Sequence, residues 1–326
     1  MQASTTYAEE PICYIFEYVI IPPGHSKARE GVLEQMEEKE NFEEQEPGDL
    51  RLKPVVYAIP GMEEAIVQKD ITYKTVDGNE LKLDVYYPSD YDGETRLPAV
   101  IFVHGDGPSE FLKDAKDWGE YTSWGQLAAA SGLIAVTFNH RSTEVLTRLY
   151  EAASDVDDLI AFVRDDSKML GIDANRIAIW TCSAGGPIGL RSALRDASQY
   201  VHCIVSYYAI SDLKVYYEEP EEETEFPGPP LPAFSQEVFD EFSGTAHVSR
   251  ESGTIAPMLI VRAGLDNPRL NASIARLVTV AVAKNVNIDF MNHASGHHAF
   301  DILDDNERSR EIIRATLEFV KGHLVM

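Results

Sequence analysis

Cysteine is scarce in this 326-residue chain, which contains only Cys13, Cys182 and Cys203. An odd number of cysteines at these wide spacings fits neither a disulfide framework nor a cysteine-ligated zinc site. We therefore expect reduced thiols and a cytoplasmic location. A secretory signal is not expected either, because residues 9–11 are Glu-Glu-Pro where positive charge and then an apolar run would be needed.

Basic residues and long apolar runs are also few. The chain has 28 Lys and Arg against 54 Asp and Glu, which gives a formal net charge of -26 at pH 7. Such a surface repels nucleic-acid phosphates and anionic lipid headgroups, so we expect neither nucleic acid nor a membrane as a partner. No stretch reaches the roughly eighteen uninterrupted apolar residues of a membrane span. The 44% hydrophobic and 25% charged residues that are present suit a globular protein with a sizeable core.

The chain divides into two parts of different composition. Residues 1–65 contain a strong β pattern at 12–21, followed by a glutamate-rich block at 30–46. We interpret this part as an N-terminal extension that either packs on the main body or pairs its apolar strand with a second copy, which would give a homo-oligomer. Residues 66–326 have the pattern of one α/β domain.

The pattern from residue 66 onwards predicts a mostly parallel sheet. Two alternating segments, 70–75 and 81–87, flank the turn signal Asp77-Gly78 and predict an antiparallel hairpin. Six short apolar strands then alternate with amphipathic helices, as expected for strands buried on both faces of a parallel sheet. We expect these strands at residues 99–103, 133–138, 177–181, 203–208, 258–262 and 287–290. One of the helices is expected to begin behind Ser154 as its N-cap.

One connection is longer than a crossover helix needs. Residues 215–253 include six glutamates between 218 and 225 and four prolines between 227 and 232, a composition that disfavours regular structure. Because the segment follows the C-terminal end of a predicted strand, we interpret it as a candidate lid. A surface loop without a role is the alternative.

Ser183 stands where a buried strand passes directly into a helix. The surrounding sequence, Thr181-Cys182-Ser183-Ala184-Gly185, resembles the nucleophile elbow G-x-S-x-G, in which the serine lies on a sharp turn. Thr181 takes the place of the first glycine, so the match is incomplete. The simpler interpretation of Ser183 is an N-cap of the following helix.

Partners for a nucleophilic serine follow later in the chain. A serine hydroxyl needs a base to take its proton, and the base needs a carboxylate to fix its tautomer. Asp266 directly follows one predicted strand, and His298 follows the next. An aspartate in such a place is most often a turn residue. The order Ser183, Asp266, His298 at the ends of successive strands nevertheless predicts a catalytic triad.

Acyl transfer also needs an oxyanion hole, because negative charge develops on the carbonyl oxygen. The loop His104-Gly105-Asp106-Gly107, after the first parallel strand, can bring backbone N–H groups close to a ligand. We predict the N–H groups of Asp106 and Ala184 as the donors. A carboxylate there would oppose the oxyanion, so we expect the Asp106 side chain to point away.

These motifs resemble those of the α/β-hydrolase superfamily, in particular its carboxylesterase and dienelactone hydrolase branches. The resemblance covers residues 66–324 and is carried by residues 104–107, 181–185 and 296–300. It implies an α/β-hydrolase fold, with an antiparallel N-terminal hairpin on a mostly parallel central sheet and helices on both faces. It also implies a serine carboxylesterase-type hydrolase that cleaves a small-molecule ester through an acyl-enzyme, with no metal and no other cofactor.

Competing assignments of the site residues are less favoured. Dienelactone hydrolases use a cysteine nucleophile, but Cys182 lies one position before the apex of the elbow and is interpreted as a buried packing residue. His293, His297 and His298 lack the spacing and the carboxylates of a zinc site. We predict His298 rather than His297 as the base, because resembling hydrolases commonly place a small residue and then phenylalanine after it. A serine peptidase for short peptides and a catalytically silent ligand-binding protein remain as alternatives.

Overall fold

The computed structural model describes residues 49–195, 200–218, 233–250 and 255–325. The strand predicted at 12–21 and the glutamate-rich block at 30–46 lie outside the described residues, as does the segment 219–232 of the candidate lid. Among the residues that are described, no helix combines the length and apolar composition needed to cross a membrane.

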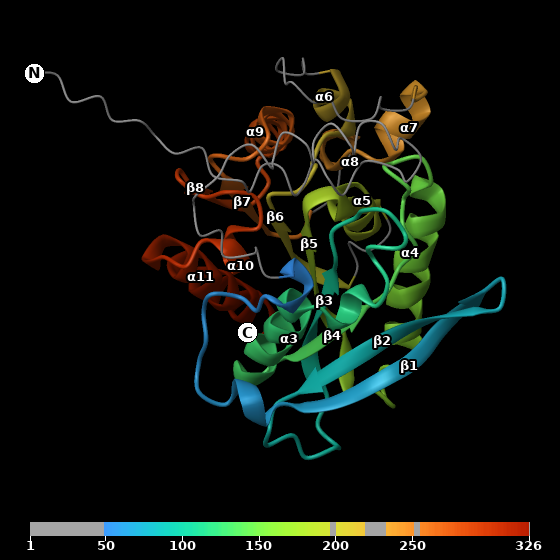
Figure 1. Ribbon diagram of the computed structural model, residues 1–326, viewed down its shortest axis with the longest axis vertical. Coiled ribbons are helices and arrows are strands. Elements are labelled where there is room, and N and C mark those ends of the chain that lie inside the picture. The colour runs from blue at the N-terminus through green and yellow to red at the C-terminus, as the bar shows by residue number, and fades with distance from the viewer. Residues whose placement is uncertain (1–48, 196–199, 219–232, 251–254, 326) are drawn as a thin grey trace, which may run out of the picture.

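An eight-stranded sheet forms the centre of the molecule (Figure 1). Its strands are β1 Ile66–Val76, β2 Asn79–Tyr87, β3 Leu97–Val103, β4 Ile134–Phe138, β5 Ile172–Cys182, β6 Val201–Tyr207, β7 Met258–Ala263 and β8 Ile288–His293, in the order β1-β2-β4-β3-β5-β6-β7-β8. The β1–β2 and β2–β4 pairs are antiparallel and the others are parallel. The predicted hairpin and all six predicted parallel strands are therefore confirmed. β5 starts five residues earlier than predicted, because Ile172 pairs with Leu97 before a shift in register, and β1 starts four residues earlier than predicted.

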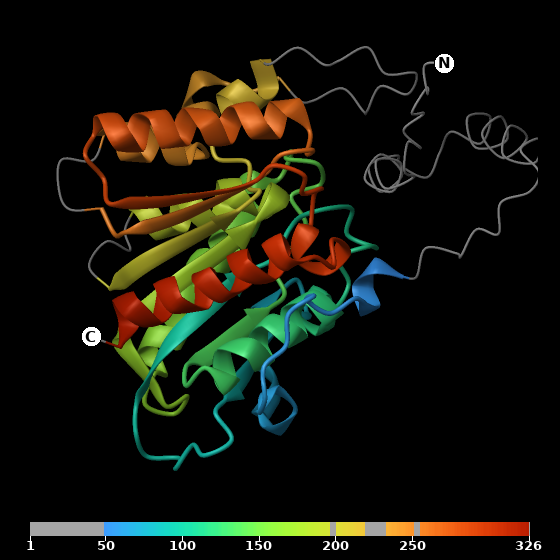
Figure 2. The ribbon, with the colours of Figure 1, turned by 90° about the vertical axis from the view of Figure 1, so that its left-hand side faces the viewer.

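Helices cover both faces of the sheet, as predicted (Figures 1 and 2). One face carries α3 Gly119–Ala130 and α11 Glu307–Leu324, and the other carries α4 Leu149–Asp165, α5 Gly186–Arg195 and α9 Pro268–Ala283. Shorter helices are α6 Leu213–Glu218, α7 Gln236–Glu241, α8 Gly244–Arg250 and α10 Phe300–Leu303, with 3-10 turns η1 Leu50–Leu52, η2 Met62–Glu64, η3 Ala115–Asp117 and η4 Ser183–Gly185. Apolar side chains of β3 to β7 are almost wholly buried between the two helical layers, as the continuous apolar runs predict.

The predicted helix start at Ser154 is wrong. Helix α4 begins at Leu149, and Ser154 lies within it, where its Oγ accepts a hydrogen bond of 3.1 Å from Lys74 Nζ. The preceding turn explains the difference. Residues 144–146 are Glu, Val and Leu, and their φ values of 47°, 57° and 67° are left-handed without any glycine. A turn of this kind leaves no recognisable signal in the sequence, so the start of α4 could not be placed from it.

Residues 49–65, which we name the N-terminal strap, pack on the main body. The Val55 N–H donates to Ser123 Oγ on α3 at 2.9 Å, and the Val56 N–H donates to the Asp301 carbonyl oxygen on α10 at 2.8 Å. The strap also passes so close to Gly119 that a Cβ there would lie 2.6 Å from the Leu52 carbonyl oxygen. This part of the predicted extension therefore belongs structurally to the body.

The second half of the candidate lid also belongs to the body. Helix α8 packs against α5 and α9, and the side chains of Phe242 and Val248 are fully buried. Residues 233–250 are thus largely helical and packed. Because 219–232 are not described, the lid itself stays a prediction.

Candidate active site

Ser183 occupies a strained turn between β5 and α5. It is the first residue of η4 and has a φ of 51°, in the left-handed region that a serine rarely adopts. A Cβ at Gly185 would lie 2.2 Å from the His104 carbonyl oxygen, so this position requires glycine. The serine does not act as a side-chain N-cap, because η4 has Cys182 at its N-cap and no side-chain hydrogen bond there. The geometry is that of a nucleophile elbow.

The missing first glycine of the elbow motif has a structural counterpart on α5. Thr181 is fully buried, and its side chain faces Gly189. A Cβ at Gly189 would lie 2.5 Å from Thr181 Oγ1 and 2.7 Å from Thr181 Cβ. The strand end and the helix therefore approach closely because the helix residue, and not the strand residue, lacks a side chain.

The structure brings Ser183, His298 and Asp266 together. Ser183 Oγ lies 2.9 Å from His298 Nε2, and His298 Nδ1 lies 2.7 Å from Asp266 Oδ2. An ionised carboxylate can only accept, so the imidazole proton lies on Nδ1 and Nε2 is left to accept from the serine hydroxyl. Only 6% of Ser183, 15% of the His298 side chain and 4% of the Asp266 side chain are exposed, which shields these hydrogen bonds from water. Such an arrangement can remove the serine proton during attack on a carbonyl carbon.

The other two histidines of the region face different partners. His297 Nδ1 lies 3.0 Å from Asp304 Oδ1, and the His297 N–H donates to the other oxygen of that carboxylate. His293 is buried, and its Nε2 lies 3.1 Å from Ser309 Oγ. His298 is therefore the histidine that reaches Ser183. Within the described part of the chain, no group of three or more His, Cys, Asp or Glu side chains could hold a metal ion.

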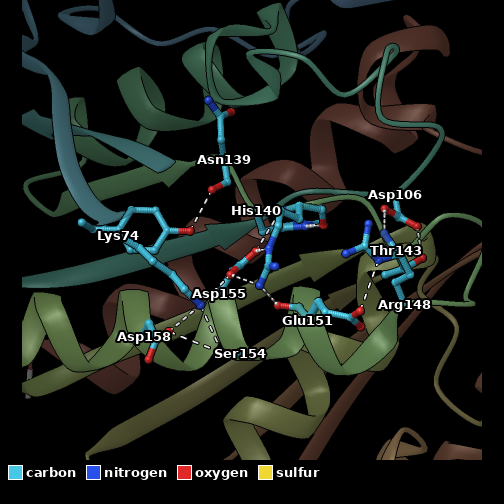
Figure 3. Close-up of polar contacts among 12 residues, drawn as sticks. Lys74, Asp106, Asn139, His140, Thr143, Arg148, Glu151, Ser154, Asp155 and Asp158 are labelled. Carbon is cyan, nitrogen blue, oxygen red and sulfur yellow. Dashed lines mark hydrogen bonds and ion pairs between the residues drawn. The ribbon is translucent and has the colours of Figure 1, made fainter. Parts of the chain in front are cut away.

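Residues 104–107, which we name the oxyanion loop, approach Ser183. The Asp106 side chain of this loop lies beside Thr143 (Figure 3). A Cβ built at Gly105 would lie 3.4 Å from Ser183 Cβ, so the backbone of the loop passes directly over the elbow. The Asp106 carboxylate accepts hydrogen bonds from the Thr143 N–H, at 3.0 Å, and from the Thr143 hydroxyl. The carboxylate is thus directed at Thr143, and its orientation relative to the developing oxyanion stays a prediction. The N–H groups of Asp106 and Ala184 remain the predicted donors.

The segment after β4 supports the oxyanion loop. Thr143 is fully buried, and Ser142 Oγ donates to the Gly107 carbonyl oxygen at 2.5 Å. The segment is anchored in turn by Arg141, whose guanidinium makes two hydrogen bonds of 2.8 Å to the buried Asp155 carboxylate on α4. Sequence reasoning did not identify Thr143, because a threonine in a loop carries no signal of its own.

Cys182 does not resemble a nucleophile. Its thiol is buried, and Sγ lies 3.5 Å from the Tyr121 hydroxyl. Burial raises the pKa of this thiol well above its usual value, which keeps it protonated. The structure therefore agrees with its interpretation as a packing residue.

A buried polar cluster behind His298 was missed from the sequence. The Tyr208 ring lies against the imidazole, with 4.8 Å between the ring centroids. The Tyr208 hydroxyl donates to Asp301 Oδ1 at 2.6 Å and lies 3.5 Å from Glu120 Oε1. Burial raises the pKa of both carboxyl groups. The sequence shows Glu120 and Asp301 as acidic residues among apolar ones, but this pattern does not indicate that the two side chains lie close together.

Comparison with known proteins gives one family and several relatives. The model of the family described as BD-FAE matches residues 83–268, more than half of the chain, and this region contains the oxyanion loop, the elbow and Asp266. Isoprenylcysteine alpha-carbonyl methylesterase ICME of Arabidopsis thaliana is 28% identical over 151 residues, which cover 46% of this chain and 33% of that protein. Probable dipeptidyl-aminopeptidase B of Coccidioides posadasii is 23% identical over 287 residues, which cover 83% of this chain. The match spans only 29% of the length of that relative.

Solved structures of similar fold include esterase 2 of Thermogutta terrifontis. Its native form superimposes with a TM-score of 0.60 at 17% identity, covering 81% of this chain and 94% of that chain. The form phosphorylated by paraoxon gives a TM-score of 0.59 at 19% identity, covering 82% and 95%. Together with the strand order, these likenesses confirm the predicted α/β-hydrolase fold.

Proposed function

The chain belongs to the BD-FAE family, and on that premise we propose that it is a serine hydrolase that cleaves carboxylic ester bonds of small substrates. The observation that carries the proposal is the continuous hydrogen-bonded series from Ser183 through His298 to Asp266 at a strained elbow. The esterase and methylesterase names among similar proteins support the same reaction class.

The reaction proceeds in two halves through an acyl-enzyme. His298 Nε2 takes the proton of the Ser183 hydroxyl while Oγ attacks the ester carbonyl carbon. The backbone N–H groups of Asp106 and Ala184 stabilise the oxyanion, and the imidazolium then returns its proton to the departing alcohol. In the second half, His298 takes a proton from the water that attacks the acyl-enzyme, and the imidazolium then returns it to Ser183 Oγ as the carboxylic acid leaves. Asp266 holds the imidazole in position and stabilises its positive charge.

Labelling and turnover together test the proposal. A fluorophosphonate probe should label the wild-type protein, and p-nitrophenyl esters of increasing acyl length should show both the activity and the size of the pocket. Ser183→Ala should abolish labelling and lower kcat by a factor of about 10³ to 10⁶. Cys182→Ser is the matched control and should retain both signals. Full labelling of the alanine variant would exclude Ser183 as the nucleophile.

A serine peptidase for short peptides is the second candidate, favoured by the dipeptidyl-aminopeptidase B relatives. The same nucleophile would serve both reactions, so a dipeptidyl p-nitroanilide measured beside the p-nitrophenyl esters separates them. Ester turnover without amide turnover supports the esterase. A catalytically silent binding protein would turn over neither substrate and would not be labelled.

The cytoplasmic location also remains a proposal, which cell fractionation tests.

A further inference from the structure

The buried cluster behind His298 joins three parts of the fold. Tyr208 follows β6 with a φ of 35°, Asp301 lies on α10 and Glu120 lies on α3. All three residues are buried, with 1%, 0% and 7% of their surfaces exposed. The tyrosine ring contacts the imidazole, while the tyrosine hydroxyl reaches both carboxyl groups. The cluster is therefore coupled to the proposed base through one side chain.

Chain geometry fixes Asp301 relative to His298. Between them, Ala299 has a φ of 57°, and its carbonyl oxygen accepts from the N–H groups of Ile302 and Leu303 at 3.0 Å each. The Val56 N–H of the N-terminal strap holds the Asp301 carbonyl oxygen from the other side. The backbone of Asp301 is therefore held in a fixed position relative to that of His298.

The hydrogen bonds show which of the two carboxyl groups carries the charge. Asp301 accepts one strong hydrogen bond on each oxygen, from the Tyr208 hydroxyl at 2.6 Å and from Trp124 Nε1 at 2.9 Å. Glu120 has no comparably short bond: the Tyr208 hydroxyl lies 3.5 Å from its Oε1, and Tyr121 makes a second side-chain contact with it. Within the described ranges, neither carboxyl group forms an ion pair with Lys or Arg. Hydrogen bonds to the ionised form favour that form, so the charge lies on Asp301 and Glu120 is protonated.

We propose that Asp301 is a second carboxylate supporting His298, whose buried negative charge stabilises the imidazolium formed when Ser183 gives up its proton. The inference rests on the proposed function, because it assigns a role within the same site. Asp301 is a positioning residue, since it contacts neither Ser183 nor the position of the substrate carbonyl carbon. It acts through Tyr208 and through the low dielectric around the cluster.

The pH dependence of the site provides the test. His298 contacts Asp266 after β7, Ser183 on η4 and Tyr208 after β6, and Asp301 on α10 acts on it electrostatically. Glu120, Tyr121 and Cys182 are the titratable groups that lie next to this set. Burial raises the pKa of Tyr208, Tyr121 and Cys182 well above their usual values, so these three stay neutral over the working range. A charge change near the imidazole can therefore be made selectively at Asp301.

The experiment compares Asp301→Asn with Glu120→Gln in kcat/KM against pH for p-nitrophenyl acetate. Asparagine keeps an acceptor for Trp124 and can donate to Tyr208, so it preserves the cluster and removes one charge. Loss of a nearby negative charge disfavours the imidazolium, so the rising limb should move to lower pH by about 0.5 to 1.5 units, and plateau kcat should fall about tenfold. Glu120→Gln replaces one neutral group with another and should move the limb by less than about 0.2 units.

Two further measurements keep the proposal separable from folding and from the proposed function. Tyr208→Phe keeps the ring against His298, removes a hydrogen bond to Asp301 and should move the limb in the same direction, even if Asp301→Asn fails to fold. An NMR titration of His298 in the Ser183→Ala background measures the same change in the imidazole pKa without any turnover. Its result therefore does not depend on whether the protein hydrolyses esters. An unmoved imidazole pKa in Asp301→Asn overturns the inference. A shift in Glu120→Gln alone also overturns it, because the charge would then lie on Glu120.

Discussion

Gly189 lies on α5 and faces Thr181 at the end of β5. Replacing this glycine would test why the elbow has threonine where the usual motif has its first glycine. In the wild-type background, Gly189→Ala places a Cβ 2.5 Å from Thr181 Oγ1 and 2.7 Å from Thr181 Cβ. Neither atom can move away easily, because Thr181 is fully buried in a central strand. Overpacking costs about 1 to 3 kcal/mol, and contacts this short with an immobile side chain belong to the upper part of that range, about 2 to 3 kcal/mol. Alanine gains about 1 kcal/mol over glycine in a helix. The net effect should be destabilisation by about 1 to 2 kcal/mol.

In the Thr181→Gly background, the same substitution should have the opposite sign. The obstructing Cβ and Oγ1 are then absent, so Gly189→Ala should stabilise by about 1 kcal/mol through helix propensity alone. The two backgrounds should therefore differ by about 2 to 3 kcal/mol, a coupling expected only of residues in contact. Urea unfolding of the four proteins of the cycle measures this difference, provided that the m-values agree.

A second glycine provides the control. Gly322 lies on α11, and a Cβ there would meet nothing within 4 Å. Gly322→Ala should stabilise by about 1 kcal/mol in both backgrounds. If Gly189→Ala has the same sign in both backgrounds, the close approach of Thr181 to α5 does not explain the substituted motif.

The remaining predictions concern the site and its pH range. His298→Ala should lower kcat about as much as loss of the nucleophile, whereas His297→Ala should leave substantial activity in steady-state assays; the reverse pattern would transfer the role to His297. Thr143→Val removes a hydrogen bond to the oxyanion-loop carboxylate and should lower kcat about tenfold with little change in KM, and Thr143→Ser should restore it. Burial lowers the pKa of His104 well below 6.5, so below about pH 6.5 only the unfolded chain takes up this proton. As the pH is lowered below this value, His104 should reduce the free energy of unfolding by about 1.4 kcal/mol per pH unit. Chemical unfolding of His104→Asn at several pH values should lack this contribution.

The strands could be predicted because their apolar runs reflect burial on both faces. Val100, Ile101, Ile179 and Ile204 are almost inaccessible, and side chains of this kind leave a continuous pattern that turns and helices interrupt. The order of Ser183, Asp266 and His298 was also readable, because each follows its own strand and parallel strands end at one edge of a sheet.

Contacts between distant segments could not be predicted in the same way. The misplaced Ser154 cap followed from three left-handed residues without glycine, a conformation that side-chain pattern does not encode. Asp301 and Glu120 are 181 positions apart and meet only through Tyr208, so no local rule relates them. Thr143 likewise becomes meaningful only when its hydroxyl is found beside Asp106.

The N-terminal strap sets the boundary for any shortened or fused version of the protein. A protein that begins at β1 would lack Val55, which is buried, and would leave the Ser123 hydroxyl and the Asp301 carbonyl oxygen without their strap donors. Because the same turn of α10 holds His298 in place, such trimming would weaken the proposed base from a distance. Affinity tags, protease sites and immobilisation linkers therefore belong upstream of Asp49, whose carboxylate caps the first turn of the strap.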